Sequence, residues 1–207
     1  MMRDQFVYYP ALSCSRIKKH YTGDISYARV ALEKGVSLHH QLLDLKPEHM
    51  NLEAYNVYTA IGSHPVASRI MNGAINEHPL IKEVKIGRHT IIGKAMFDIY
   101  NPQLNVIADI KTTSARSIGD FASDMVKHYN HIQAVWYSMI ADIDPKNFYY
   151  IGVTAASKRL KSKSDTILVY RHNDHEIADA KKLITGYLDI NIKELKTYFN
   201  SSYKKES

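Results

Sequence analysis

Only one of the 207 residues is a cysteine, Cys14. A single thiol cannot form an internal disulfide, and it cannot hold an iron–sulfur cluster or a cysteine-rich zinc site. Any metal ion in this protein must therefore be bound by oxygen and imidazole ligands. No iron–sulfur cluster is expected.

Long apolar runs are also missing from the sequence. No apolar segment approaches the ~20 residues that cross a bilayer, and the opening residues, MMRDQFVYYPALSCSR, lack the apolar stretch of a signal peptide. There is no phosphate-binding glycine loop, no Gly-x-Ser-x-Gly elbow and no set of protein-kinase motifs. We expect a cytoplasmic protein without a membrane partner.

The overall composition is that of a folded globular domain. The chain is 45% hydrophobic and 23% charged, close to the averages for such domains. Its length fits one domain better than two, so we expect a single domain over residues 1–207, with a core at about 26–172 and a helical tail at 173–207. Lys and Arg exceed Asp and Glu by 27 to 21, a modest excess that suits a polyanionic partner without establishing one.

The spacing of apolar residues changes along the chain from helical to strand-like. The segment 80–111 is rich in Ile and Val and is divided by Gly-Arg and Asn-Pro turn signals, which is typical of three consecutive antiparallel strands. The expected elements are, in order, helices at 26–45 and 51–73, the second broken near Gly62 and Pro65, three strands in 80–111, one long helix at 118–143, strands at NFYYIGVTA and TILVYR, and a helix from 174 onward. This order predicts a mixed α/β fold whose five-stranded sheet is flanked by helices.

Two carboxylates flank the second turn of the β-rich region. If that turn is a four-residue loop over 102–105, the register places Asp98 opposite Asp109. Directly opposed side chains have Cβ atoms about 4.5–5.5 Å apart, so two like charges repel there unless a cation neutralises them. The same register pairs Asn101 with Val106, Tyr100 with Ile107, and Ile99 with Ala108.

Lys111 lies on the same face of its strand as Asp109, because side chains alternate along a strand. The strand NVIADIK is almost continuously apolar before its charged end, which is typical of a central strand buried on both faces. Unpaired ions are costly to bury, so a metal ion between the two carboxylates is more economical than isolated charges. The alternative is a salt bridge from Lys111 to Asp98 or Asp109 at an exposed strand end.

Four segments share a pattern with a known nuclease group. They are, in chain order, Gly35-Val-Ser-Leu-His39, Gly93-Lys-Ala-Met-Phe-Asp98, Asp109-Ile110-Lys111-Thr112-Thr113 and Tyr129-Asn-His-Ile-Gln133-Ala-Val-Trp-Tyr137. The set resembles the RecB-like branch of the PD-(D/E)XK nuclease superfamily, which includes the phage RecE and lambda exonuclease groups. The resemblance spans about half of the chain and implies a restriction-endonuclease-like core.

The resemblance implies a catalytic metal surrounded by His39, Asp98, Asp109 and the backbone carbonyl of Ile110. Mg²⁺ prefers hard oxygen ligands and retains several waters, which leaves positions for a phosphate and an attacking water. Mn²⁺ would bind well to a set that includes an imidazole. Relatives often carry a further acidic residue upstream, for which Glu77 is the first candidate.

For two of these proposed metal ligands, another residue nearby in the sequence could take the same role. His40 replaces His39 if the alignment shifts by one residue, and either could be a helix-surface histidine. Glu83 is the second candidate for the upstream acidic residue.

The resemblance assigns catalytic roles to Asp98, Asp109, Lys111, Gln133 and Tyr137. Lys111 would lie near the nucleophilic water or the scissile phosphate and offset the charge that develops in the transition state. Gln133 and Tyr137 project from one side of the helix, near the active centre or DNA. The plain alternative is that Gln133 is a surface residue and that the tyrosine packs in the core.

Several polar residues suit contact with a phosphate backbone, which gives affinity without sequence specificity. The threonines among them could equally end the strand, and a solvated loop explains the lysines and Arg159 nearly as well. The candidates are Thr112, Thr113, Arg116, Lys158, Arg159, Lys161 and Lys163.

Two histidine pairs, His128 with His131 and His172 with His175, have spacings compatible with a metal on a helix. Because no cysteine is near them, we interpret them as surface residues.

The functional hypothesis is a metal-dependent DNA nuclease, most consistent with an exonuclease of recombination, repair or replication, because those are the groups that the chain resembles. A homo-oligomer and a single-strand annealing protein are the partners, besides DNA, that the resemblance implies. A nucleic-acid-binding protein with this fold and no cleavage, an endonuclease and an RNA nuclease are the alternatives.

Overall fold

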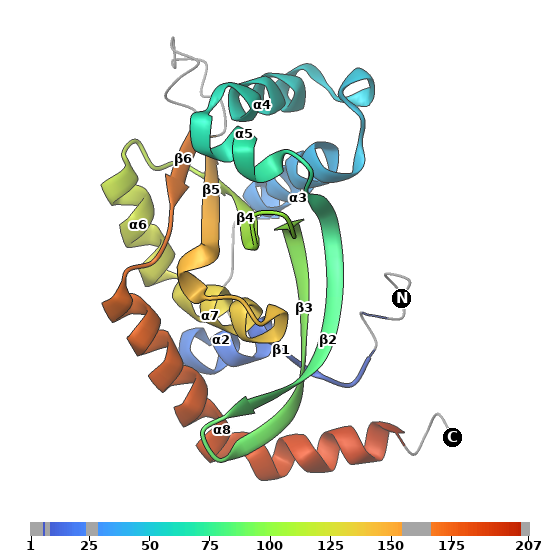
Figure 1. Ribbon diagram of the computed structural model, residues 1–207, viewed down its shortest axis with the longest axis vertical. Coiled ribbons are helices and arrows are strands. Elements are labelled where there is room, and N and C mark those ends of the chain that lie inside the picture. The colour runs from blue at the N-terminus through green and yellow to red at the C-terminus, as the bar shows by residue number, and fades with distance from the viewer. Residues whose placement is uncertain (1–5, 7–8, 24–28, 155–166, 204–207) are drawn as a thin grey trace.

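A mixed sheet forms the centre of the molecule in the computed structural model, which describes residues 6, 9–23, 29–154 and 167–203 (Figure 1). The sheet has six strands in the order β1-β3-β4-β5-β6, and β2 pairs with β3. The β2–β3, β3–β4 and β5–β6 pairs are antiparallel, whereas β1–β3 and β4–β5 are parallel. The strands are β1 (Leu12–Ser13), β2 (Ile75–Ile86), β3 (His89–Asn101), β4 (Val106–Thr113), β5 (Phe148–Thr154) and β6 (Ile167–Tyr170).

Helices cover the sheet in two groups. Figure 1 shows α3, α4 and α5 gathered at one end of the molecule, and α2, α7 and α8 at the other. The helices are α2 (Cys14–Thr22), α3 (Arg29–Asp44), α4 (Leu52–Ser63), α5 (Pro65–Met71), α6 (Ile118–Lys127), α7 (Asn130–Ala141) and α8 (Asp174–Tyr203), with short 3-10 turns η1 (Pro47–His49) and η2 (Pro145–Asn147). No helix in this described part of the chain has both the length and the apolar character that a membrane crossing requires.

The predicted mixed α/β class is confirmed, and so is the break between α4 and α5 near Pro65. All five predicted strands are present. The sheet also contains β1, a two-residue strand that the sequence did not indicate and that pairs Leu12 with Gly93.

The single long helix predicted over 118–143 is wrong, because the chain breaks into α6 and α7 at His128 and Tyr129. Tyr129 has a left-handed backbone, with φ 53° and ψ 31°, which ends one helix and redirects the next. Phe121 of α6 and Trp136 of α7 nevertheless belong to the same buried cluster. The apolar stripe therefore continues across the break, so the spacing of apolar residues alone does not reveal where the helix is interrupted.

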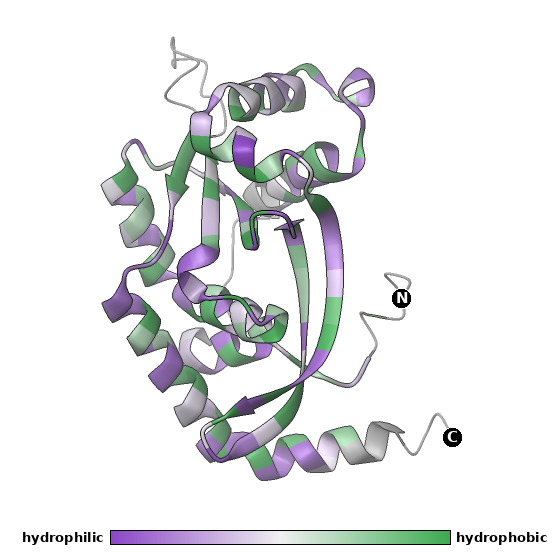
Figure 2. Ribbon diagram, viewed as in Figure 1, coloured by the Kyte–Doolittle hydropathy of each residue, from purple (hydrophilic) through white to green (hydrophobic). Residues whose placement is uncertain are grey.

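The two faces of the sheet bury separate apolar cores. Along β4, Ile107 packs with α2, α6, α7 and α8, whereas Val106, Ala108 and Ile110 pack with α3, α4 and α5. This alternation is the period of a strand buried on both faces. Figure 2 shows hydrophobic and hydrophilic residues interspersed along both α6 and α8, as expected for helices that cover a core on one side.

The interpretation of the histidine pairs as surface residues is wrong for His131 and His172, which are buried. Their rings lie 5.9 Å apart between α7 and the start of α8. His172 Nδ1 lies 3.0 Å from Glu176 Oε2, and His131 Nε2 lies 3.3 Å from Asp179 Oδ2. These contacts connect α8 to the core.

Gly93 allows α7 to pack directly on β3. A Cβ atom at this position would lie 2.7 Å from Trp136 Cζ2 and 3.2 Å from Ile140 Cδ1, which is closer than packed atoms tolerate. We expect Gly93→Ala to lower the free energy of unfolding by about 1–3 kcal/mol through overpacking, measured by urea denaturation. Gly62→Ala in α4 is the control, since nothing lies within 4 Å of its added Cβ. Equal stability of Gly93→Ala and the parent protein would contradict this packing.

Candidate active site

A cleft of about 670 Å³ opens beside the end of β4. Residues from α2, α3, β2, β4 and α6, with the start of α7, line it. They are Lys18, Gly35, Val36, Leu38, His39, Glu77, Ile110, Lys111, Thr112, Thr113, Ser114, Asp124, Met125, His128 and Asn130.

The β3–β4 hairpin brings Asp98 to this cleft. The predicted register is confirmed for the three pairs nearest the turn, which end at Ile99 with Ala108. Beyond them, Asp98 Oδ2 accepts a hydrogen bond from the backbone N–H of Ile110 at 2.9 Å. The Asp98 carboxylate thus accepts the hydrogen bond of a β4 backbone N–H group at the point where the pairing of β3 with β4 ends.

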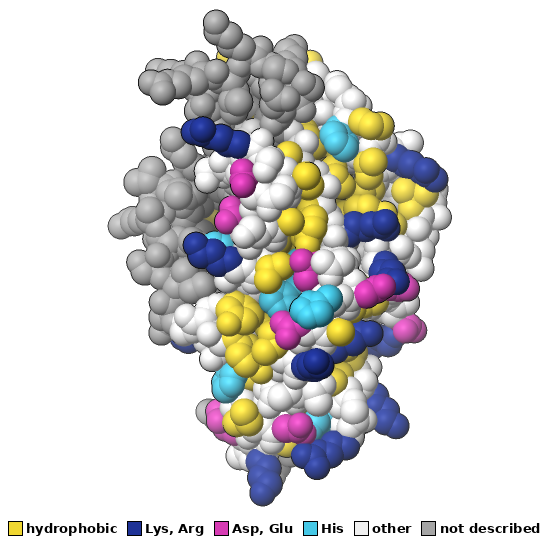
Figure 3. Space-filling view, turned by 90° about the vertical axis from the view of Figure 1, so that its left-hand side faces the viewer, with side chains coloured by type: hydrophobic (Ala, Val, Ile, Leu, Met, Phe, Trp, Pro, Cys, Tyr) yellow, Lys and Arg dark blue, Asp and Glu magenta, His cyan; other side chains and the backbone are white. Residues whose placement is uncertain are grey.

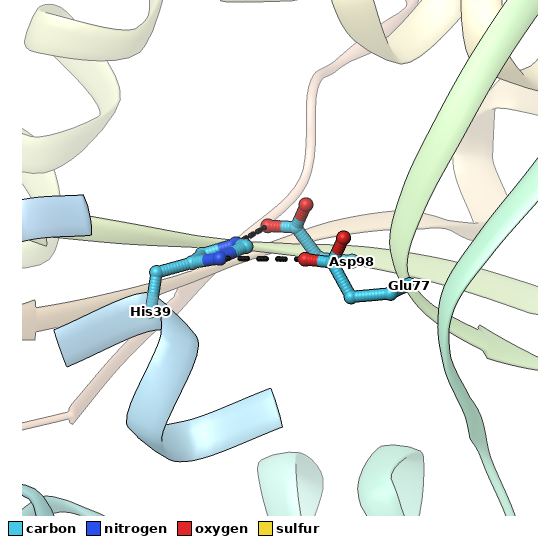
Figure 4. Close-up of side chains that lie close together, drawn as sticks. All are labelled: His39, Glu77 and Asp98. Atoms are coloured by element: carbon cyan, nitrogen blue, oxygen red, sulfur yellow. Dashed lines mark ion pairs between the residues drawn. The ribbon is translucent and has the colours of Figure 1, made fainter. Parts of the chain in front are cut away.

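Three elements contribute to an acidic cluster with one histidine, formed by His39 of α3, Glu77 of β2 and Asp98 of β3 (Figure 4). His39 Nε2 lies 2.8 Å from Asp98 Oδ2, and His39 Nδ1 lies 3.5 Å from Glu77 Oε1. One ligand atom from each residue falls within 4.8 Å of the others. Imidazole nitrogen and carboxylate oxygen are suitable ligands for Mg²⁺ or Mn²⁺, so the donor set fits a divalent cation.

The helix that carries His39 lies close to β4 because of Gly35. A Cβ atom on Gly35 would lie 3.1 Å from Thr112 Oγ1. The neighbouring His40 points elsewhere, since its Nδ1 lies 2.7 Å from Asp44 Oδ2 in an exposed pair one helical turn away. Of the two adjacent histidines, His39 is the one that faces the acidic cluster.

Glu77 has a strained backbone. The pairs Asn76 with Ile99 and His78 with Phe97 place Glu77 opposite Asp98, yet its φ is 50°. A left-handed conformation at a non-glycine residue costs about 1–3 kcal/mol and is found most often at functional sites. Glu83, the other upstream candidate, is exposed and pairs with Ile92, six residues farther along β2.

The acidic cluster attracts positive charge. Burial alone lowers the pKa of His39, but its hydrogen bond to Asp98 and the charges of Asp98, Asp109 and Glu77 outweigh burial and raise that pKa. A divalent cation at the same carboxylates would supply this compensation and compete with the proton on His39.

Asp109 is not one of the three residues of that cluster; it is buried beside Gln133 and the partly exposed Lys111. Gln133 Nε2 donates a hydrogen bond to Asp109 Oδ1 at 2.5 Å. Lys111 Nζ lies 2.6 Å from Asp109 Oδ2, although this oxygen accepts no hydrogen bond of regular geometry from the described residues. Gln133 is buried, so the alternative that it is a surface residue is wrong.

Burial and the nearby charge of Asp98 raise the pKa of Asp109, while Lys111 and His39 oppose this shift. Burial also acts to lower the pKa of Lys111, but the charges of Asp109 and Asp98 outweigh it and raise that pKa. Lys111 therefore remains a cation at the wall of the cleft.

The other predicted site residues fall into three groups. Tyr137 packs in the core, with its ring 5.5 Å from Phe97 and 6.1 Å from Phe148, and burial raises its pKa well above the usual 10. Thr112 and Thr113 line the cleft, and Arg116 is exposed beyond it. The basic residues Lys158, Arg159, Lys161 and Lys163 lie outside the described part of the chain.

Four polar residues of the cleft, Lys18, Ser114, Asp124 and Asn130, were not predicted from the sequence. Lys18 Nζ donates a hydrogen bond to Asn130 Oδ1 at 2.7 Å. Burial lowers the pKa of Lys18, and the charge of Lys111 adds to this effect. Apolar residues at Cys14, Ile17 and Tyr21, three and four positions apart, are the sequence signal that could have revealed this helix.

No protein-family model and no curated protein matches this chain. A solved structure of a candidate exonuclease from Eubacterium rectale aligns at 15% identity over 97% of this chain and 85% of that one, with a TM-score of 0.60. A phage-related exonuclease from Haemophilus somnus 129PT aligns at 15% identity over 97% and 98% of the two chains, with a TM-score of 0.43. LHK-Exo, solved with dAMP, aligns at 16% identity over 96% of both chains, with a TM-score of 0.42. The likeness to the Eubacterium rectale structure shows that this chain has a restriction-endonuclease-like α/β core of the kind found in an exonuclease-type structure.

Proposed function

We propose that this chain is a metal-dependent DNA nuclease of the RecB-like type. The observation that carries the proposal is the convergence of His39, Glu77 and Asp98 from three elements, in one cleft with Lys111. The fold shared with an exonuclease-type structure supports it. Because the sequence motifs resemble those of the RecE and lambda exonuclease groups, we propose exonuclease action on DNA ends.

The proposed metal ligands are His39, Glu77 and Asp98, with Asp109 and the carbonyl of Ile110 as further candidates from the sequence resemblance. When bound, Mg²⁺ or Mn²⁺ would neutralise phosphate charge and acidify a water molecule for attack. The chain itself holds the three side chains together, through the ion pairs of His39 and the bond from Ile110 to Asp98.

Lys111 and Gln133 act around Asp109 in the proposed reaction. Gln133 fixes one carboxylate oxygen of Asp109, and the other lies against the ammonium of Lys111. This arrangement holds Lys111 at the cleft, where its charge would stabilise the anionic transition state of phosphodiester hydrolysis. Tyr137 is partly buried against the core and remains neutral, so we assign it to support of this wall rather than to proton transfer.

We further propose one nuclease domain over residues 1–207 that works in the cytoplasm on DNA in recombination, repair or replication. A homo-oligomer and a single-strand annealing protein are its proposed partners.

Divalent metal should stabilise the folded protein through the acidic cluster. We expect Mn²⁺ or Mg²⁺ to raise the melting temperature, because a ligand that binds only the native state shifts unfolding by mass action. Asp98→Asn and Glu77→Gln should abolish most of this shift, measured by thermal unfolding with and without EDTA. Glu83→Gln is the matched control on the same strand and should keep the full shift. An unchanged metal response in Asp98→Asn would contradict the assigned ligands.

Cleavage should depend on the Asp109–Lys111 pair. With end-labelled linear DNA and Mg²⁺, we expect Asp109→Asn and Lys111→Ala to lose roughly 10²–10³-fold in rate, the scale for removal of one charge-stabilising group. Lys85→Ala, an exposed lysine of β2, is the control and should cut normally.

A parallel assay with covalently closed circular DNA tests the mode of cleavage. An exonuclease leaves closed circles intact, so their digestion would contradict that mode. Digestion of linear DNA that persists in Asp109→Asn would contradict the proposed site.

A further inference from the structure

Lys18 enters the cleft from α2, a helix outside the nuclease-like sequence motifs. It lines the cleft together with Lys111 and the His39–Glu77 side of the acidic cluster. The cleft therefore contains two lysines from different elements, and the proposed reaction uses only one of them.

The position of α2 is fixed by its own packing. Cys14 and Ile17 are buried in the core, and Tyr21 donates a hydrogen bond to the carbonyl of Leu183 in α8 at 2.6 Å. Lys18 is one turn beyond Cys14 on the same side of the helix. Because α2 is held in place by these contacts, the Lys18 side chain points into the cleft.

A chain of buried hydrogen bonds holds the ammonium of Lys18. Tyr150 Oη donates to the backbone carbonyl of Asn130 at 2.7 Å, and Asn130 Nδ2 donates to Met125 Sδ at 3.4 Å. Asn130 is 5% exposed, so its Oδ1 is held facing Lys18 Nζ at 2.7 Å. An ammonium has three donors, and this bond uses one of them.

The two lysines differ in charge compensation. Lys111 has Asp109 at 2.6 Å. Within the described ranges, the polar contact of Lys18 is the neutral amide of Asn130, and no carboxylate lies within salt-bridge distance of its Nζ. The more distant charge of Asp109 partly offsets the burial of this cation, and an anion bound directly to Lys18 would offset it further.

The face drawn in Figure 3 has Lys and Arg in separate groups, interspersed with acidic and hydrophobic side chains, and no continuous basic patch.

We propose that Lys18, held by Asn130, is a phosphate-binding point that takes a phosphodiester group of the DNA strand next to the group being cleaved. The inference rests on the proposed nuclease function and adds a substrate-positioning residue to it. Lys18 binds and orients the strand, whereas the acidic cluster and Lys111 act at the scissile phosphate.

The test is the salt dependence of DNA binding by Lys18→Gln, in which the amide can still donate to Asn130 but the charge is gone. The probe is a fluorescein-labelled duplex, with Ca²⁺ replacing Mg²⁺, and anisotropy gives Kd across a range of salt concentrations. Loss of one phosphate contact should reduce the slope of log Kd against log salt by about 0.9 and raise Kd roughly three- to tenfold at ~0.1 M salt. With Mg²⁺, KM should rise by a similar factor while kcat changes little.

Two further variants separate charge from structure. Lys18→Arg keeps the charge and should retain the slope, and Lys196→Gln removes an exposed charge of α8 and should also retain it. An unchanged slope and Kd in Lys18→Gln, in a protein that cleaves DNA and loses cleavage in Asp109→Asn, would overturn this inference alone. A parent protein that neither binds nor cleaves DNA would overturn the proposed function as well.

Discussion

Asp109 carries a carboxylate that is almost completely removed from water, on the central strand of the sheet, and an ion in that position requires compensation from its neighbours. Gln133 supplies a hydrogen bond and Lys111 supplies a charge. Lys111 is thereby held as a cation at the cleft, and α7 is tied to β4 through Gln133. The nearby charge of Asp98 acts against Asp109, so the two carboxylates are best accommodated when a cation binds the acidic cluster formed with His39.

The hairpin was predictable because turn length determines register. A four-residue loop fixes Asn101 opposite Val106, and the remaining pairs follow from the two-residue period of a strand. The burial of β4 on both faces was predictable from its continuous apolar residues. The approach of His39 to Asp98 joins segments far apart in the chain, and only the resemblance to a known nuclease pattern indicated it.

Other features depend on contacts that have no local signal. The left-handed Tyr129 follows no glycine or proline, and the apolar stripe continues through it, so the sequence predicted one helix where there are two. Asp109 lies beside Lys111, and its role as a metal ligand together with Asp98 stays a prediction; the acidic cluster draws in addition on Glu77 of the neighbouring strand. The contribution of Lys18 was missed because α2 lies before the segment expected to form the core.

Asn130 and Gln133 are three residues apart on α7, so their backbones differ by about 4.5 Å along the helix axis. One contacts Lys18 and the other Asp109, which means that backbone hydrogen bonds of a single helix set the interval between these two charged groups. Deleting or inserting one residue between them would rotate one side chain by about 100° and disconnect it. Length changes in the surface loops leave this interval unchanged, so such loops can vary between relatives while the spacing of charges in the cleft is preserved.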